Sequence, residues 1–318
     1  MGSIVEIQQL QKTFGSIVAV DQVSFTVSQG EVLGFLGPNG AGKSTTMKMI
    51  TGFLTPTSGT VKVNGFDIQQ QPLEAKKSLG YLPEGAPAYG DMTPWTFLLF
   101  MGEMRGFRGQ DLKGRVADTV KKVNLEGVIE QPIETLSKGF KRRVGLAQAI
   151  LHDPSVLILD EPTDGLDPNQ KHEVRALIKE MSREKAIILS THILEEVHAV
   201  CTRAMIIAKG KVITDDTPAD LEARSRYHNA VVLRFQGSIP NDASAILRSV
   251  SGVKVIEELQ DGEANSGYCV ISEGGLPILS SIHQCVKNQN WDVTEVSVDR
   301  GQLDDVFRSL TMPAQALT

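Results

Sequence analysis

The sequence predicts an α/β protein with a mixed central sheet, an antiparallel β layer, a helical insert and a small α+β domain at the C-terminal end. Segments 31–36 and 155–161 are largely apolar, which is typical of strands buried on both faces of a parallel sheet. A glycine-rich loop follows the first of them and leads into a helix pattern. After residue 226 shorter strand and helix patterns alternate, so we expect one domain over 1–226 and a second over 227–318.

Length and composition limit the possible functions. The 318 residues are sufficient for two cores of different size, and the net charge of −6 disfavours a general nucleic-acid binder, which carries a basic excess. Cys201, Cys269 and Cys285 lack metal-ligand spacing, and we expect them to be thiols of a reducing compartment. The N-terminus does not resemble a signal peptide, and no apolar run approaches the ~20 residues needed to cross a bilayer, so we expect a soluble chain.

Strand patterns flank the glycine-rich loop. Segments 4–10 and 23–28 have strand composition and are separated by a turn at Gly15. The segment 61–63 is closed by Asn64-Gly65, a typical hairpin turn. These patterns predict the antiparallel β layer.

The loop itself is typical of a phosphate-binding site. Its glycines let successive N–H groups point at a phosphate chain, and the following helix adds the positive end of its dipole. In this pattern Lys43 reaches the β- and γ-phosphates and the Ser44 hydroxyl ligates Mg²⁺. We predict a nucleoside triphosphate site formed by Gly37, Pro38, Asn39, Gly40, Ala41, Gly42, Lys43, Ser44 and Thr45. Phe14, between the first strands, can stack on a purine or belong to the core.

A helical insert is expected over about 85–152. It follows the short strand 79–82. Thr93-Pro94 is typical of a helix start, and we expect helices over 93–105 and 112–123. The apolar excess of the first helix indicates either ordinary core or a partner surface.

Ser137 begins a further expected helix. As an N-cap it leaves backbone N–H groups available to an anion. The alternative is that Ser137 only caps the helix, while Lys138, Lys141, Arg142 and Arg143 form a solvated basic face. Local sequence alone favours the alternative.

Asp160 and Glu161 close the apolar segment 155–161. Ligands bind at the carboxyl ends of strands in open α/β sheets. Asp160 is therefore placed to hold Mg²⁺, directly or through water, and Glu161 to activate an attacking water as general base. Two adjacent acids are by themselves more often solvated or capping groups, but with the phosphate loop they complete one site.

The remaining segments extend both domains. A strand at 185–189 leads to His192, which precedes a helix; the dipole of that helix favours the neutral imidazole, which can donate one hydrogen bond to a γ-phosphate. Further helices are expected at 169–181 and 217–226, and a hairpin at 203–208 with 211–214. In the second domain we expect strands or helices at 231–235, 243–250, 253–258, 268–271, 276–287 and 293–298, a last helix around 303–310 and a frayed tail at 313–318.

Taken together, these motifs resemble those of the nucleotide-binding subunit of ATP-binding cassette (ABC) transporters over about residues 3–226. The resemblance rests on an adenine-stacking aromatic at Phe14, a Walker A motif at 37–45, a signature at 136–140, a Walker B motif with its glutamate at 156–161, a D-loop at 165–167 and a switch histidine at His192. It implies the P-loop NTPase fold of an ABC ATPase, with ATP and Mg²⁺ as cofactors. It also implies that Ser137, Gly139 and Asp167 act at the nucleotide.

Two positions depart from the family pattern. The signature is Leu-Ser-Lys-Gly-Phe rather than Leu-Ser-Gly-Gly-Gln, but it keeps Ser137 and Gly139. Glu84 stands where the family usually has glutamine. The resemblance implies that its carboxylate faces Mg²⁺ or the lytic water, with an added negative charge.

The resemblance also implies partners. Two copies would meet head to tail as a homodimer, with each ATP between the Walker A motif of one copy and the signature of the other. Work would pass to a separate permease docked at about 85–105, so that the chain lies on the cytoplasmic face of the bacterial inner membrane and reaches the membrane only through the permease. Leu-Pro-Glu at 82–84, the signature variant and the stretch 299–307 are similar to the ABC-2 type branch, in particular to drug-resistance and gliding-motility-type ATP-binding subunits.

Two alternatives remain open. A soluble ABC-family ATPase could act on ribosomes or DNA, but the single cassette, the absence of a coiled-coil or zinc insertion and the acidic balance disfavour it. A catalytically weak regulatory cassette is suggested by Glu84 and Phe140, whereas Glu161 and His192 argue against it.

Overall fold

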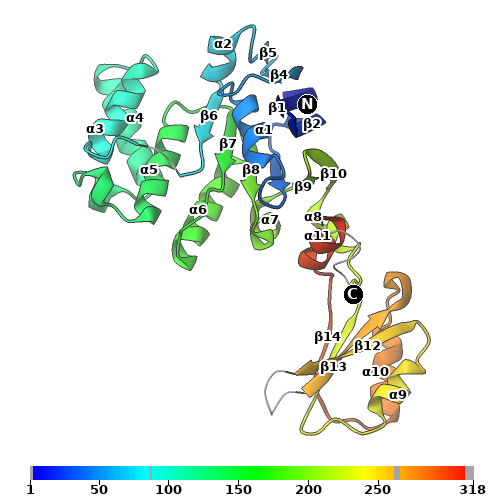
Figure 1. Ribbon diagram of the computed structural model, residues 1–318. Coiled ribbons are helices and arrows are strands. Elements are labelled where there is room, and N and C mark those ends of the chain that lie inside the picture. The colour runs from blue at the N-terminus through cyan, green and yellow to red at the C-terminus, as the bar shows by residue number, and fades with distance from the viewer. Residues whose placement is uncertain (1–2, 86–87, 261–265, 312–318) are drawn as a thin grey trace. The chain divides into compact units, whose positions relative to one another are not determined.

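The computed structural model describes residues 3–85, 88–260 and 266–311 (Figure 1). The expected frayed tail at 313–318 and two residues of the expected permease contact, 86 and 87, lie outside these ranges. The chain divides into two compact units, Met1–Asp216 and Thr217–Thr318. The division lies before the expected boundary at 226, and Ser225 Oγ and the Arg226 backbone N–H both donate to the Asp305 carboxylate within the C-terminal unit.

A six-stranded sheet forms the centre of the first unit, in the order β10-β9-β3-β8-β7-β6. Its strands are β3 (Val32–Leu36), β6 (Leu79–Leu82), β7 (Val156–Asp160), β8 (Ala186–Thr191), β9 (Arg203–Ala208) and β10 (Lys211–Asp216). All neighbouring pairs are parallel except β10 with β9. Every residue of β3, β7 and β8 is buried, which confirms the interpretation of their apolar patterns.

The predicted antiparallel layer is a second sheet in the order β2-β1-β4-β5. It consists of β1 (Ser3–Phe14), β2 (Ile17–Ser28), β4 (Ser58–Val63) and β5 (Phe66–Asp67). Phe25 of this sheet packs against Phe35 of β3, with ring centroids 5.7 Å apart, so the two sheets share one core. Helix α1 (Lys43–Ile50) contributes Met47 and Met49 to that core, and α2 (Pro72–Lys77) follows β5.

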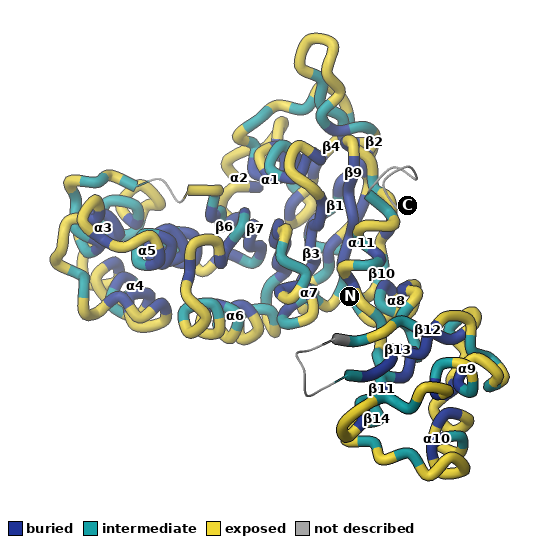
Figure 2. The backbone as a smooth tube through the Cα atoms, turned by 60° about the horizontal axis from the view of Figure 1, so that its bottom comes forward, coloured by how far each residue is buried: buried dark blue, intermediate teal, exposed yellow. Residues whose placement is uncertain are grey.

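The helical insert contains α3 (Pro94–Met104), α4 (Gly109–Lys122), α5 (Lys138–Ile150) and the short 3₁₀ helices Glu126–Val128 and Ile133–Thr135. Helix α3 begins with a capping box, because Thr93 and Thr96 each accept from the other's backbone N–H. Figure 2 shows α5 as the most buried of these helices. Its apolar side chains share a second core with α3, α4 and the facing side of β7.

Two more helices complete the first unit, α6 (Pro168–Met181) and α7 (Leu194–Val200), which contact one another. No helix in the described ranges has the length and apolar character that a membrane crossing requires.

The second unit is a βαββαβ module. Its elements are β11 (Val231–Phe235), α9 (Ala243–Arg248), β12 (Val253–Gln260), β13 (Ser266–Ser272), α10 (Leu279–Asn288) and β14 (Val293–Val298). The sheet order β12-β13-β11-β14, with every pair antiparallel, is the split β-α-β arrangement. A 3₁₀ helix, Glu273–Gly275, lies between β13 and α10, and α8 (Pro218–Glu222) contacts the final helix α11 (Leu303–Thr311). Helix α8 is shorter than the expected helix 217–226.

Candidate nucleotide-binding site

The parallel strands bring their carboxyl ends to one edge of the central sheet. Leu36 of β3 pairs with Thr191 of β8, and Asp160 of β7 pairs with Ser190. A cavity of about 310 Å³ opens at this edge. It is lined by loop residues 39–45, by Ala19 and by two acids, Glu84 and Glu161. The fold thus brings most of the expected phosphate loop together with two of the three expected acids.

The phosphate loop needs glycine at particular positions. A β-carbon at Gly37 would lie 2.4 Å from the Ile207 carbonyl oxygen of β9, and one at Gly42 would lie 2.5 Å from the Ala19 carbonyl oxygen. Gly42 also has a φ of 107° and is the N-cap of α1, where no side chain caps the helix. The first amides of α1 are therefore available to an anion from the cavity.

Lys43 is held against the loop. Its Nζ donates to the carbonyl oxygens of Gly37 at 2.7 Å and Pro38 at 3.3 Å. Pro38 itself does not line the cavity, so it contributes a backbone acceptor. Burial lowers the pKa of the Lys43 ammonium, and the negative charges of Glu161, Asp160 and Glu84 oppose that shift.

Asp160 has the environment of a cation ligand. It is fully buried, and its Oδ1 accepts hydrogen bonds from Ser190 Oγ and, at 3.4 Å, from Ser44 Oγ. Its Oδ2 has no hydrogen-bond partner among the described residues. A buried, unpaired carboxylate oxygen beside a serine hydroxyl suits a hard cation with oxygen ligands, so these residues fit Mg²⁺.

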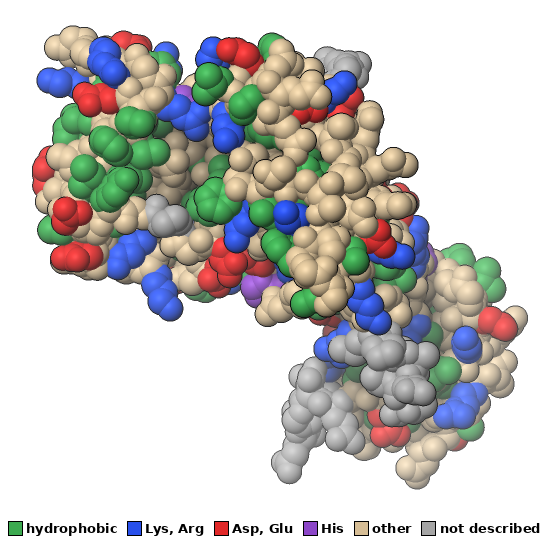
Figure 3. All heavy atoms as spheres, turned by 45° about the horizontal axis from the view of Figure 1, so that its top comes forward, with side chains coloured by type: hydrophobic (Ala, Val, Ile, Leu, Met, Phe, Trp, Pro, Cys, Tyr) green, Lys and Arg blue, Asp and Glu red, His purple; other side chains and the backbone are tan. Residues whose placement is uncertain are grey.

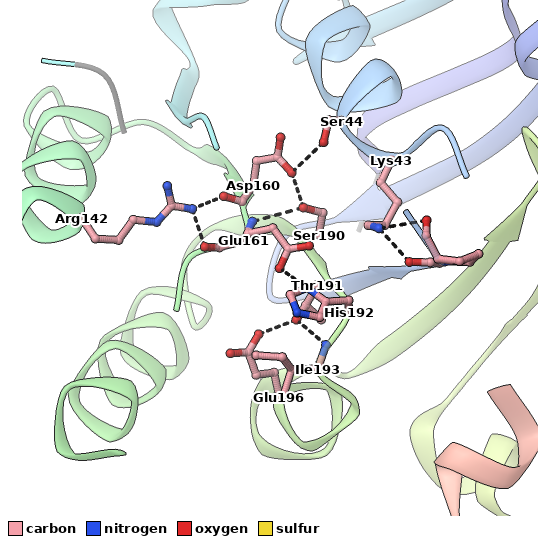
Figure 4. Close-up of polar contacts among 12 residues, drawn as sticks. Lys43, Ser44, Arg142, Asp160, Glu161, Ser190, Thr191, His192, Ile193 and Glu196 are labelled. Carbon is pink, nitrogen blue, oxygen red and sulfur yellow. Dashed lines mark hydrogen bonds and ion pairs between the residues drawn. The ribbon is translucent and has the colours of Figure 1, made fainter. Parts of the chain in front are cut away.

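Glu161 is held in an unusual backbone conformation. Its φ of 53° lies in the left-handed region, and its N–H donates to Ser190 O at 3.1 Å and to Ser190 Oγ at 3.2 Å. Its Oε2 lies 2.8 Å from His192 Nδ1 (Figure 4). The Glu161 side chain is 13% exposed and that of His192 is 53% exposed. Because a carboxylate only accepts, His192 Nδ1 carries the proton of this bond.

The backbone on both sides of His192 is fixed. The Ile193 N–H donates to Thr191 Oγ1 at 3.0 Å, and Thr191 Oγ1 donates to Glu196 Oε2 at 2.6 Å. Glu196 is buried, and burial raises the pKa of its carboxyl. Figure 4 shows this chain of contacts next to Glu161. Sequence reasoning assigned no role to Ser190, Thr191 or Glu196.

The signature and D-loop residues lie elsewhere in the unit. Ser137 is the N-cap of α5 and accepts from the Phe140 N–H at 3.3 Å, while Asp167 caps α6 by accepting from the Gln170 N–H at 2.9 Å. Gly139 packs against Gln170, whose Oε1 would lie 2.3 Å from an added β-carbon. Ser137, Gly139 and Asp167 are not among the described residues that line the cavity.

Phe14 lies at the end of β1 and is 48% exposed, with Lys12 Nζ 5.1 Å from its ring centroid. The alternative that it belongs to the core is wrong. A stacking role on a purine stays a prediction.

The interpretation of a solvated basic face is wrong for Arg142 and Arg143, which are both buried. Arg143 donates to Glu173 at 2.9 Å. Arg142 donates to the Pro83 carbonyl at 2.7 Å and also to the carbonyls of Asp160 and Glu161. The burial of both side chains depends on these contacts, which are distant in the sequence.

Comparisons with known proteins agree with this site. Residues 20–164 match a family model described as "ABC transporter". The chain is 37% identical over 224 residues to "Probable multidrug ABC transporter ATP-binding protein YbhF" of Escherichia coli (strain K12), which covers 70% of this chain; the chain spans only 39% of that relative's length. It is 32% identical over 313 residues to "Bacitracin transport ATP-binding protein BcrA" of Bacillus licheniformis, with 98% of each chain covered.

A solved structure described as "Structure of ATP binding subunit of ABC transporter" superposes with a TM-score of 0.64 at 29% identity. The match covers 69% of this chain and 92% of that one. The predicted fold class is thereby confirmed. The chain belongs to the ABC transporter family, as one of its ATP-binding proteins.

Proposed function

We propose that this chain hydrolyses Mg-ATP and powers a separate ABC-2 type permease, for export, from the cytoplasmic face of a bacterial inner membrane. The observation that carries the proposal is the cavity in which the phosphate loop faces Glu161, the acid bonded to His192. The names of the relatives, which refer to multidrug and bacitracin transport, support the export assignment. The βαββαβ unit is proposed as a dimer-stabilising or regulatory module.

Each polar side chain has a part in the proposed reaction. The triphosphate lies along 37–45 with its charge next to Lys43, and Glu161 takes the proton of the attacking water. Ser44 and Asp160, with Glu84 across the cavity, would hold Mg²⁺, which offsets charge on the β- and γ-phosphates. A neutral His192 ring has one N–H and donates it to Glu161 as observed, so the ring must turn before it donates to the γ-phosphate.

The separation of the two halves of the site supports the proposed homodimer. Ser137, Gly139 and Asp167 do not line the cavity that the phosphate loop lines. A second copy in head-to-tail orientation would supply them to the ATP, and two-fold symmetry would complete both sites at once.

The permease is proposed to dock in a groove beside the helical insert. This groove, of about 810 Å³, is lined by apolar side chains that include Phe53, Phe97 and Met101. Its charged lining residues among those described are all basic: Lys48, Lys76 and Arg105. Figure 3 shows hydrophobic side chains gathered over the part of the molecule that holds α3 and α4. The partner that fits is a short amphipathic helix of the permease with an apolar face and at least one carboxylate.

The test of dimerisation uses Glu161→Gln, which removes the base and leaves the phosphate contacts in place. We expect this variant to be a dimer at saturating Mg-ATP and a monomer without nucleotide, as measured by light scattering. A variant that stays monomeric with Mg-ATP bound would contradict the head-to-tail arrangement.

The test of the permease uses capture from membranes. The ATP-bound Glu161→Gln protein is expected to retain a small polytopic membrane protein, and Phe53→Asp, at a groove residue that is 78% exposed, is expected to abolish that capture. Leu73→Asp, at an equally exposed residue outside the groove lining, is the matched control. Retention of ribosomes or DNA instead would favour the soluble ATPase class, and undetectable ATP turnover with any permease would favour a regulatory cassette.

A further inference from the structure

One guanidinium group connects three parts of the nucleotide-binding unit. Arg142 extends from α5 and is 6% exposed. Its Nη1 donates to the Pro83 carbonyl at 2.7 Å, directly before Glu84, and its Nη2 donates to the carbonyls of Asp160 and Glu161 at the end of β7 (Figure 4). Arg142 therefore contacts the backbone at Asp160, at Glu161 and at the residue before Glu84. The hydrogen bonds go to carbonyl oxygens of the backbone and not to the carboxylates.

The contact to Glu161 has a specific physical consequence. A left-handed backbone is unfavourable for a residue with a side chain and persists only where the surroundings hold it. Ser190 holds the Glu161 N–H, and the Glu161 carbonyl accepts from Arg142 and from the Asp164 N–H at 3.1 Å, so the peptide groups on both sides of the Glu161 α-carbon are fixed. Arg142 is the side chain that contributes to this arrangement from α5.

The acids near Arg142 favour its positive charge. Burial lowers the pKa of the guanidinium, and the negative charges of Asp160, Asp164, Glu161 and Glu84 oppose that shift. Arginine remains charged in proteins, so the group donates charge-assisted bonds to these carbonyls. Arg143, the next residue, is also buried but donates to Glu173 and to carbonyls after α4, away from the cavity.

We propose that Arg142 is a positioning residue for hydrolysis: it holds the Glu161 backbone in its left-handed conformation and ties that backbone to the Pro83-Glu84 segment and to α5. Since Pro83 also lines the groove beside the helical insert, a change in the groove reaches Glu161 through one side chain. The inference rests on the proposed role of Glu161 as general base.

The first test compares Arg142→Met with Arg143→Met in the full chain. Both remove a buried guanidinium from the same helix, so we expect a similar fall in Tm. Only Arg142→Met is expected to lower kcat, by about 10- to 100-fold, because misplacement of a catalytic group by about 1 Å costs up to about 10²-fold. KM for ATP should stay within about threefold, and Arg142→Gln, which keeps N–H donors, should recover part of the rate.

The second test is a double variant. If Arg142 acts through Glu161, Arg142→Met added to Glu161→Gln should lower the residual rate by no more than about threefold, since groups that act as a unit are not additive. Independent, multiplicative losses would overturn the proposal, as would equal kcat losses in Arg142→Met and Arg143→Met. If Arg142→Met does not fold, Arg142→Gln is measured in its place. A wild-type chain without ATPase activity would instead contradict the proposed function itself.

Discussion

The N-termini of α1 and α5 differ in a way that separates the two halves of the proposed site. Helix α1 starts at a left-handed Gly42, and no side chain caps it. Helix α5 starts at Ser137, whose hydroxyl already accepts from the Phe140 N–H. The first amides of α1 have no capping side chain and can bind an anion in the cavity of the same chain. At α5 one of the first amides is already hydrogen-bonded to its N-cap side chain.

The difference indicates where binding energy and where coupling arise. The α1 end shares one cavity with Lys43, Ser44 and the acids Glu84 and Glu161, so we expect one chain to bind a triphosphate. Ser137 and Gly139 at the α5 end are not among the described residues that line that cavity, and in the proposed homodimer they would act on the ATP of the second copy. We therefore expect changes at α1 to alter nucleotide affinity and changes at α5 to alter association.

The largest effect is expected at α1. Lys43→Ala removes a cation that would donate to the β- and γ-phosphates, and the loss of charge-assisted bonds of this kind lowers Mg-ATP affinity by about 100-fold. Titration calorimetry of the isolated chain measures this. Lys62→Ala, at an exposed residue of β4, is the control and should bind like the wild type. Undiminished affinity in Lys43→Ala would contradict the assignment of nucleotide binding to the α1 end.

A smaller and more selective effect is expected at α5. Ser137→Asp keeps an efficient N-cap but places a negative charge where the partner's γ-phosphate would approach. In the Glu161→Gln background we expect unchanged Mg-ATP binding and a dimer weakened by at least about tenfold, as measured by analytical ultracentrifugation. Thr93→Asp makes the same change at the capped N-terminus of α3 and should leave the dimer intact. Equal dimerisation of both variants would contradict the assignment of α5.

A third effect concerns folding stability and not binding, and it depends on how the C-terminal end of α5 is held to the sheet. His152 Nε2 lies 2.9 Å from the Leu79 carbonyl of β6, and burial, with the nearby Arg105 charge, lowers the pKa of His152 to about 4. The unfolded chain, with a pKa near 6.5, binds the proton more readily, so this stability is complete above pH 6.5 and is lost as pH falls towards 4.

Urea unfolding at pH 7 and pH 5 measures the consequence. The wild type is expected to lose about 2 kcal/mol more than His152→Gln, which keeps a donor for Leu79 but does not titrate. His172→Gln, at an exposed residue of α6, should lose as much as the wild type. If His152→Gln shows the same pH dependence as the wild type, the buried neutral histidine is not the cause.

Much of this architecture could be predicted because it depends on local patterns. The apolar segments of β3, β7 and β8 indicated burial on two faces, and parallel strands then place their carboxyl ends together. Lys43, Ser44, Asp160 and Glu161 follow from that geometry. The caps Thr93 and Ser137 are equally local.

What could not be predicted depends on contacts distant in the sequence. A run of basic residues at 138–143 is typical of a solvated face, and only the carbonyls of Pro83, Asp160 and Glu161 explain why Arg142 is buried. The left-handed backbone of Glu161 has no signature in its own residue type, because glycine would be the usual choice there.

The hydrogen bonds around His192 also have a consequence for speed. Thr191 and Ile193 are held on either side, so a response of His192 to the γ-phosphate requires rotation of one exposed imidazole and no rearrangement of the loop. Exposed side chains change rotamer in picoseconds to nanoseconds, whereas loops and domains need up to about milliseconds. If two copies close on ATP as proposed, we expect His192 to respond to loss of the γ-phosphate faster than the two copies separate.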